Sequence, residues 1–325
     1  MNQYLQNIVL KTTGANEICG TETIQNLWSG YGKILRVSLK GGELPSVVVK
    51  HVKLPDSSNH PRGWNTDFSH QRKLKSYKVE TAWYEFWNQQ CDDNCRTPHC
   101  LALEHHGEEV IMVMEDLDVS GFPNRLSSVS WKEIQTCLKW LAYFHATFLN
   151  QGPDKLWDVG TYWHLDTRPD ELKIMDDKEL KQAAPAIDQL LRKGQYQTLV
   201  HGDAKLANFC FSDNGQNVAA VDFQYVGGGC GMKDVAYFVG SCLYEENCEA
   251  MGSQILDFYF KELKQAVNAK HSELNFDELE KEWRELYPVA WTDFHRFLKG
   301  WSPDHWKINS YSERLAREVV ENLNR

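Results

Sequence analysis

Short apolar runs separated by turn-forming residues occupy the first third of the chain and predict a β-rich region. Residues 16–29 lead into a first strand, Gly30-Tyr31-Gly32 predicts a turn, and residues 33–39 predict the second strand of a hairpin. The β-branched run 46–52 and the apolar run 110–114 predict two further strands. Between them, residues 55–65 are rich in Ser, Asn, Pro and Gly and predict a mobile loop.

Apolar residues at helical spacing dominate the rest of the chain. A helix is predicted over about 68–90, and the pair Ser130 and Glu133 is a capping-box pattern that predicts the start of another. His145 lies on the apolar face of that second helix and is expected to be a core histidine. Further helices are predicted over 178–192, from 234, around 255–263, over 276–299 and from 312. The fold class is therefore α+β.

Two more apolar runs, 198–200 and 218–221, predict short buried strands, and polar residues follow both. Asp203 comes after the first run, Asn208 follows it, and Asp222 stands directly after the second run. Oxygen ligands converging at strand ends suit Mg²⁺ that is held by one or two side chains and by substrate phosphates. Phosphoryl transfer also needs a carboxylate that orients the attacking hydroxyl and accepts its proton. The pattern predicts Asp203 as the base and Asn208 and Asp222 as metal ligands; a capped turn is the purely structural alternative.

The two segments together carry a family resemblance. His201-Gly202-Asp203 with Asn208, followed by Asp222-Phe223-Gln224, resembles the small-molecule kinases of the aminoglycoside phosphotransferase and choline kinase superfamily, nearest the ecdysteroid-kinase-like branch and its bacterial relatives. The resemblance covers most of the chain and implies a protein-kinase-like bilobal fold. A small antiparallel β lobe at 1–116 would bind the nucleotide, and a larger, mainly helical lobe at 117–325 would provide catalysis and acceptor binding.

Lys50 is the one long cation in the predicted strand 46–52. A lysine among β-branched residues either reaches the surface or faces a negative group. The resemblance implies that Lys50 holds the nucleotide phosphates and pairs with a carboxylate on the following helix. Glu80 stands at the family position, and Glu85 is a second candidate.

The resemblance places the rest of the nucleotide site at two connecting segments. Gly30 and Gly32 would let the backbone approach a triphosphate closely, although Gly-x-Gly occurs in many other hairpins. Met114, Glu115 and Leu117 would lie where the connector after strand 110–114 binds the adenine edge, while Met114 also suits a plain core position.

Composition narrows the partners and the compartment. The chain has 325 residues and a net charge of −10, which argues against a nucleic-acid partner because no basic face would attract phosphates. No apolar run approaches the length that spans a bilayer, and residues 1–14 lack a signal-peptide pattern. The nine cysteines are scattered, and Cys91, Cys95, His99 and Cys100 fit no familiar zinc spacing. A cytoplasmic protein with reduced thiols is expected, with no membrane partner; its oligomeric state cannot be read from the sequence.

Aromatic residues are dense between 276 and 306 and allow two interpretations. With Asp293 nearby they would form a cage for a quaternary ammonium, whereas at helical spacing they would simply be core. The residues in question are Trp283, Tyr287, Trp291, Phe294, Phe297, Trp301 and Trp306.

The resulting hypothesis is an ATP- and Mg²⁺-dependent kinase that transfers the γ-phosphate to a hydroxyl of a small acceptor. Choline-like amino alcohols, aminoglycosides and hydroxylated lipids or steroids are the acceptor classes that the resemblance implies. A nucleotide-binding pseudokinase or scaffold is the alternative, and Lys50, Asp203, Asn208 and Asp222 together favour the enzyme because a scaffold needs no base.

Overall fold

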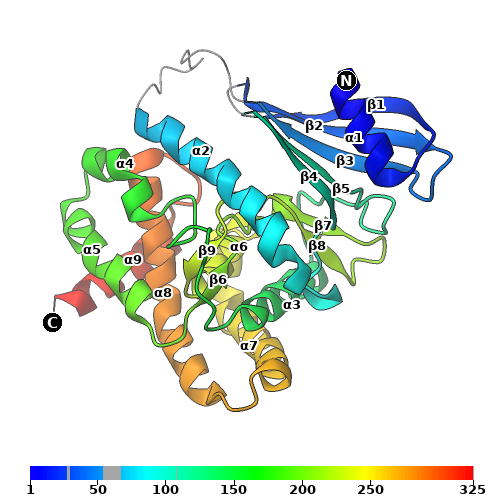
Figure 1. The fold of residues 1–325 in the computed structure, drawn as a ribbon. Coiled ribbons are helices and arrows are strands. Elements are labelled where there is room, and N and C mark those ends of the chain that lie inside the picture. Colours follow the sequence, from blue (N-terminus) through cyan, green and yellow to red (C-terminus); the bar gives the residue numbers. More distant parts are fainter. Residues whose placement is uncertain (28–29, 54–66, 108, 325) are drawn as a thin grey trace.

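A computed structural model describes residues 1–27, 30–53, 67–107 and 109–324. The side chains of residues 67 and 68 are outside that description, and so is the loop predicted over 55–65. The chain forms a five-stranded sheet and a larger helical part, which Figure 1 shows at opposite ends of the molecule. This is the α+β, kinase-like arrangement that the sequence predicts.

The sheet is antiparallel and has the order β1-β2-β3-β5-β4. Its strands are β1 (Glu17–Asn26), β2 (Gly32–Lys40), β3 (Ser46–Val52), β4 (Cys100–His106) and β5 (Glu109–Glu115). The predicted hairpin and the predicted strands at 46–52 and 110–114 are confirmed. The register places Val49 opposite Val113 and Lys50 opposite Met112.

An N-terminal helix, α1 (Gln3–Thr13), covers one face of this sheet and was not predicted. It begins at the N-cap Asn2, whose side chain accepts from the Leu5 amide, and ends at Gly14 with φ of 66°. Leu5, Ile8 and Val9 pack against the sheet. Their spacing is helical, so the signal was present but was carried by only three residues in a polar segment.

The helix α2 (Asp67–Ala82) covers the other face of the sheet. Side chains alternate along β3, so its residues point in turn toward α1 and toward α2. Val47 and Val49 point into the cluster beneath α1, and Val52 packs against Tyr77 of α2. Lys50 shares the face of Val52 and therefore also faces α2. One helix was predicted over 68–90, but the α-helical part ends at Ala82. The rest of that range forms a π-helical turn (Trp83–Trp87) and a short 3-10 turn (Asn88–Gln90).

The remaining chain forms the helical part and two short hairpins (Figure 1). The helices are α3 (Trp131–Thr147), α4 (Pro169–Ile174), α5 (Lys178–Lys193), α6 (Met232–Cys242), α7 (Glu245–Lys270), α8 (Phe276–Trp301) and α9 (Ser310–Leu323). The strand β6 (Thr198–Val200) pairs with β9 (Gly227–Gly229), and β7 (Phe209–Phe211) pairs with β8 (Val218–Ala220). The capping box at Ser130 and Glu133 is present at the start of α3.

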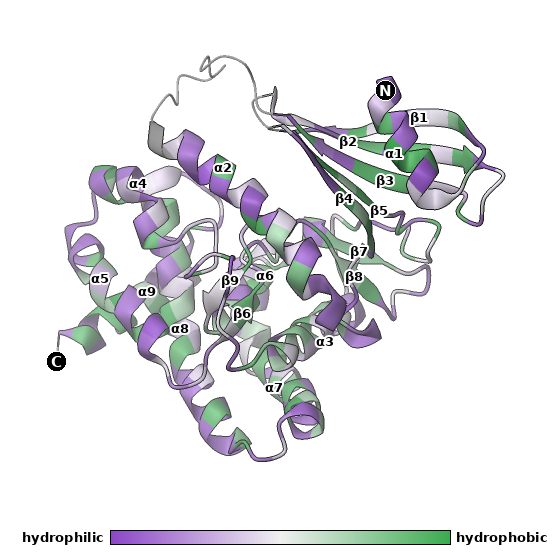
Figure 2. Cartoon of the chain, viewed as in Figure 1, coloured by the Kyte–Doolittle hydropathy of each residue, from purple (hydrophilic) through white to green (hydrophobic). Residues whose placement is uncertain are grey.

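Apolar residues explain how these elements pack. Figure 2 shows hydrophobic positions concentrated along β3 and β5, and hydrophilic and hydrophobic positions alternating along α5. In α5 the buried face includes Leu180, Ala184, Ile187 and Leu191, at the spacing of one helix face. No helix within the described residues is long and apolar enough to cross a membrane.

The seven aromatic residues named above, on α8 and in the segment after it, are mostly core. Five of them are at most 5% exposed: Trp283, Tyr287, Trp291, Phe294 and Phe297. Trp301 and Trp306 are 43% and 50% exposed. The Asp293 carboxylate accepts from Trp163 Nε1 and Arg296 Nη2. It therefore faces these partners and not a cage for a quaternary ammonium.

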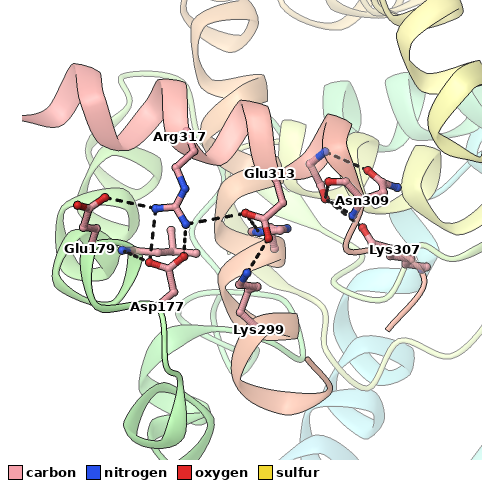
Figure 3. Close-up of polar contacts among 10 residues, drawn as sticks. Asp177, Glu179, Lys299, Lys307, Asn309, Glu313 and Arg317 are labelled. Atoms are coloured by element: carbon pink, nitrogen blue, oxygen red, sulfur yellow. Dashed lines mark hydrogen bonds and ion pairs between the residues drawn. The ribbon is translucent and has the colours of Figure 1, made fainter. Parts of the chain in front are cut away.

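The C-terminal helix is fixed to α5 and α8 by a charged network. Figure 3 shows Arg317 of α9 bonded to Asp177 and Glu179 at the start of α5. Lys299 of α8 donates to Glu313 of α9 at 2.6 Å. His295, which is 1% exposed, has its Nε2 atom 3.5 Å from the other carboxylate oxygen of Glu313.

Burial of His295 makes the stability of the fold sensitive to acid. Burial lowers the pKa of His295 from 6.5 to about 4, against the opposing effect of Glu313. Between pH 6.5 and 4 the unfolded chain therefore takes up a proton that the folded chain does not, so the free energy of unfolding falls as the pH falls. Relative to His295→Gln, the native protein should lose about 3 kcal/mol more over this range.

Urea unfolding at pH 7 and at pH 4.5 measures this difference, with the exposed His105→Gln as the matched control. Parallel pH profiles for the native protein and His295→Gln would contradict the prediction.

Candidate active site

The segment after β6 is shaped by one buried carboxylate. Asp234 of α6 accepts from the backbone amides of His201 at 2.5 Å and Gly202 at 2.9 Å, and from His145 Nε2 at 3.1 Å. Gly202 has φ of 79°, and a Cβ there would lie 2.1 Å from the Tyr225 carbonyl oxygen, so the position requires glycine. His145 is a satisfied core histidine, as predicted, since Tyr259 is its second partner.

Replacing Asp234 should therefore destabilise the fold and misplace the residues after it. In Asp234→Asn one oxygen acceptor becomes an amide donor that faces another donor, and a buried charge-assisted pair is lost. The free energy of unfolding should fall by about 3 kcal/mol. Chemical denaturation measures it, with the exposed Asp213→Asn as the control; equal midpoints for the two variants would refute the role of Asp234.

Asp203 lies in this segment and is 6% exposed. Its Oδ2 atom accepts from Lys205 Nζ at 2.8 Å and from Asn208 Nδ2 at 3.1 Å, and its Oδ1 atom accepts from the Tyr237 hydroxyl at 3.1 Å. Burial raises the pKa of Asp203, and the charge of Lys205 opposes that rise. The hydrogen bonds from Lys205, Asn208 and Tyr237 fix the orientation of the carboxylate.

The β7–β8 hairpin brings Asn208 and Asp222 together. Phe209 pairs with Ala220, and one position beyond this pair the Val221 amide donates to the Asn208 carbonyl at 3.0 Å. Asp222 directly follows Val221, so it lies at the same end of the hairpin as Asn208. The His201 ring joins both segments, because its Nδ1 atom accepts from the Asp203 amide and its Nε2 atom donates to the Val221 carbonyl. Three side chains from two separate stretches of chain thus meet at one place.

Asp222 has the properties of a cation ligand. Its φ of 71° is unusual for a residue other than glycine, and its buried Oδ1 atom has no hydrogen-bond partner among the described residues. Burial would raise the pKa of Asp222, but the charges of Lys50, Lys73 and Lys205 outweigh it and lower that pKa. An ionised carboxylate with an unpartnered buried oxygen fits a divalent cation.

Asn208 complements this arrangement. Its Nδ2 atom donates to the Asp203 carbonyl at 2.8 Å as well as to the Asp203 carboxylate, so its Oδ1 atom is turned the other way and can accept. The described residues contain no group of three or more His, Cys, Asp or Glu side chains that could hold a metal by themselves. A cation here would accordingly need oxygen ligands from a bound phosphate as well.

Lys50 and Glu80 form a buried ion pair at 2.6 Å, and both are at most 3% exposed. The second oxygen of Glu80, Oε2, has no partner in the described part of the chain. Glu85 is exposed, so the structure selects Glu80. Phe223, next to Asp222, stacks on Trp83 with ring centroids 4.4 Å apart, which ties the end of α2 to the same site.

Two more side chains belong to the site and escaped the sequence analysis. Lys73 of α2 donates to Gln224 at 2.7 Å, and burial lowers its pKa to about 8. Lys73 lies two helical turns before Glu80 on the same face of α2, so the sequence could have indicated that it belongs to the site. Tyr237 likewise lies one turn after Asp234 on α6, and the spacing could have revealed it.

The predicted connector residues Met114, Glu115 and Leu117 make hydrogen bonds and packing contacts within the protein. Arg96 and the His99 amide donate to the Glu115 carboxylate, and the Glu115 amide donates to the His99 carbonyl. Met114 is 7% exposed and belongs to the main core. Leu117 packs against Cys210 and Ala219, on the hairpin that carries Asn208 and Asp222.

The two glycines of the first hairpin differ. Gly32 has φ of 124°, and a Cβ there would lie 2.0 Å from the His51 carbonyl oxygen, so strand packing alone requires glycine. Gly30 has φ of 77° and open space around its missing side chain. Part of the tip, residues 28–29, lies outside the described residues.

The model of the ecdysteroid kinase-like family matches residues 71–151 and 161–271, which is more than half of the chain. The chain belongs to the ecdysteroid kinase-like family. The matched residues include Glu80, Asp203, Asn208 and Asp222.

Solved structures show that the fold of this ecdysteroid kinase-like protein is shared more widely. A choline kinase from Cryptosporidium parvum Iowa II matches with a TM-score of 0.56 and 11% identity, over 99% of this chain and 95% of that one. A Plasmodium vivax ethanolamine kinase matches with a TM-score of 0.50 and 14% identity, over 94% and 85%. The GDP complex of aminoglycoside 2'-phosphotransferase-IIIa has a TM-score of 0.49 and 12% identity, over 98% of each chain.

No curated protein sequence matches this ecdysteroid kinase-like protein. The ecdysteroid kinase-like family and the kinase-like fold are nevertheless those that the sequence predicts.

Proposed function

We propose that this protein is an ATP- and Mg²⁺-dependent kinase that transfers the γ-phosphate to a hydroxyl of a small acceptor. The observation that carries the proposal is the convergence of an oriented carboxylate, Asp203, with Asp222 and with the Lys50–Glu80 pair in one buried site. Membership of a kinase-like family supports it. The nucleotide would bind against residues 1–116 and the acceptor against residues 117–325.

Asp203 acts as the base in this proposal. Tyr237, Lys205 and Asn208 fix its two oxygens, so a free lone pair can meet an acceptor hydroxyl without rearrangement. Burial keeps its pKa above the ordinary value, which improves it as a proton acceptor. It orients the hydroxyl and takes up the proton as the new phosphate ester bond forms.

The other residues hold charge. Lys50, positioned by Glu80, would bind the nucleotide phosphates, and Gly30, Gly32, Met114, Glu115 and Leu117 would line the rest of the nucleotide site. Asn208 and Asp222 would hold Mg²⁺, which, when bound, offsets negative charge on the transferring group. Lys73, beside Asp222, adds a second cation that would stabilise a phosphate oxygen.

The test is ADP release by the purified protein with Mg·ATP and a panel of acceptors: amino alcohols, aminoglycosides, sugars, sterols and hydroxy acids. We expect release that needs both Mg²⁺ and one class of acceptor and that is absent in Asp203→Asn. Binding of Mg·ATP without transfer to any acceptor would favour a pseudokinase instead. A cytoplasmic location, where Mg·ATP is available, is part of the proposal.

A further inference from the structure

Lys307 occupies the position in which a cationic acceptor would be expected. Its Nζ atom lies 5.1 Å from the ring centroid of Tyr237, 5.5 Å from that of Phe294 and 5.7 Å from that of Trp306. Tyr237 is one of the three residues that donate to the Asp203 carboxylate. Tyr237 of α6 and two rings of the aromatic stretch thus surround one cation, and that cation is a lysine of the protein itself.

The backbone holds Lys307 firmly in this place. The Ser312 hydroxyl of α9 donates to the Lys307 carbonyl at 3.1 Å, and the Lys307 amide donates to His305 Nδ1 at 3.2 Å. Asn309 and Ser312 form the capping box of α9, so the loop ends in a fixed geometry, and Figure 3 shows Lys307 beside this start of the helix. The lysine is therefore a built part of the site.

The ammonium group has no anionic partner of its own. Among the side chains that the structure describes, no carboxylate lies within ion-pair distance of Lys307, although the residue is only partly exposed. Burial lowers its pKa to about 8, with Asp203 opposing that effect. A partly desolvated cation without a counter-ion, next to the reacting position, would be stabilised by an anion.

Two arginines lie near the neighbouring rings of Tyr162 and Tyr225. Arg168 lies 5.8 Å from the ring centroid of Tyr162, and that ring packs against the ring of Tyr237 with centroids 5.6 Å apart. Arg168 is paired with Glu171 at 3.1 Å. Arg72 donates to the Thr167 carbonyl, and no described carboxylate is within ion-pair distance of it.

We propose that Lys307 is a specificity residue which selects an acceptor whose hydroxyl is accompanied by an anionic group, a carboxylate, phosphate or sulfate, and rejects cationic acceptors. The inference rests on the proposed function and names the acceptor class of that site. An anion would pair with Lys307 while the hydroxyl lies against Asp203. A quaternary ammonium would have to displace Lys307 from the rings and remain next to a like charge.

The first experiment observes Lys307 directly and needs no acceptor. The protein is labelled with lysine carrying carbon-13 at Cε, and the Lys307 signal is identified by its loss in Lys307→Arg. With a saturating, non-hydrolysable Mg·ATP analogue in the nucleotide site, sulfate and tetramethylammonium are added separately at matched ionic strength. The signal of the exposed Lys261 reports general salt effects.

We expect sulfate to shift the Lys307 signal saturably and tetramethylammonium to leave it unchanged. A saturable shift with tetramethylammonium, or no shift with sulfate beyond that of Lys261, would overturn the inference. Failure of the Mg·ATP analogue to bind would instead overturn the proposed kinase function, because analogue binding is measured separately by calorimetry before the salts are added.

The second experiment compares acceptors of similar size that differ in charge: choline, its neutral carbon isostere and hydroxypivalate. Hydroxypivalate should be the best of the three. Lys307→Met should raise its KM by about 10-fold or more with a smaller change in kcat, and Lys307→Arg should restore most of the loss. Preference for choline, or an unchanged KM in Lys307→Met relative to Lys261→Met, would contradict the assignment.

Discussion

Asp203→Asn should lower kcat by about three orders of magnitude while leaving the affinity for Mg·ATP within a few-fold of the native value. The amide has nearly the same volume, its oxygen can still accept from Lys205 and Asn208, and its NH2 group can donate to the Tyr237 hydroxyl, so the local packing persists. It cannot take up the proton of the acceptor hydroxyl, and that loss falls on the transition state. Coupled-assay kinetics and calorimetry of nucleotide binding measure the two quantities.

The control for this variant is Asp213→Asn, the same change at an exposed position on the β7–β8 hairpin, which should keep native turnover. If Asp203→Asn retains more than about a tenth of the native kcat, Asp203 is not the base, since general base catalysis contributes at least 100-fold.

Asp222→Asn should abolish the Mg²⁺ dependence of nucleotide binding and lower kcat by on the order of a thousand-fold. The carboxylate is ionised because Lys50, Lys73 and Lys205 lower its pKa, and its unpartnered oxygen is the one suited to a divalent cation. An amide has no negative charge, so a cation would lose its main ligand. Nucleotide titrations with and without Mg²⁺ report the effect without any acceptor.

The stability of the variant separates binding from folding. Replacing the carboxylate removes its attraction to Lys50, Lys73 and Lys205, so Asp222→Asn should also unfold at a lower urea concentration. Added Mg·ATP should raise the unfolding midpoint of the native protein and of Asp213→Asn but not that of Asp222→Asn. An equal rise in all three would show that Asp222 does not hold the cation.

Local sequence patterns were enough to predict much of the site. Asp203, Asn208 and Asp222 each follow a short apolar run, and the hairpin that joins the last two is a local pairing of neighbouring segments. The side of β3 on which Lys50 lies follows from strand alternation. Glu80 was predicted on the helix that comes after β3, and Lys73 could have been found on the same face of that helix.

Other features needed the packed molecule. The aromatic residues of α8 have the same spacing whether they form a cage or a core, and only contacts with Trp163 and Arg296 show that Asp293 faces inward. Met114 fits both core and pocket by composition, and its burial places it in the main core without excluding contact with a nucleotide.

The sequence by itself determined most of the strands and helices along the chain and the candidate residues for phosphoryl transfer, because these follow from periodicity and from motifs within a few residues. The tertiary structure decided which faces meet. Lys307 comes from a loop far along the chain from Tyr237 and Asp203, and no local pattern links them. Contacts between distant segments depend on how whole helices pack, and here that packing placed a cation beside the proposed base.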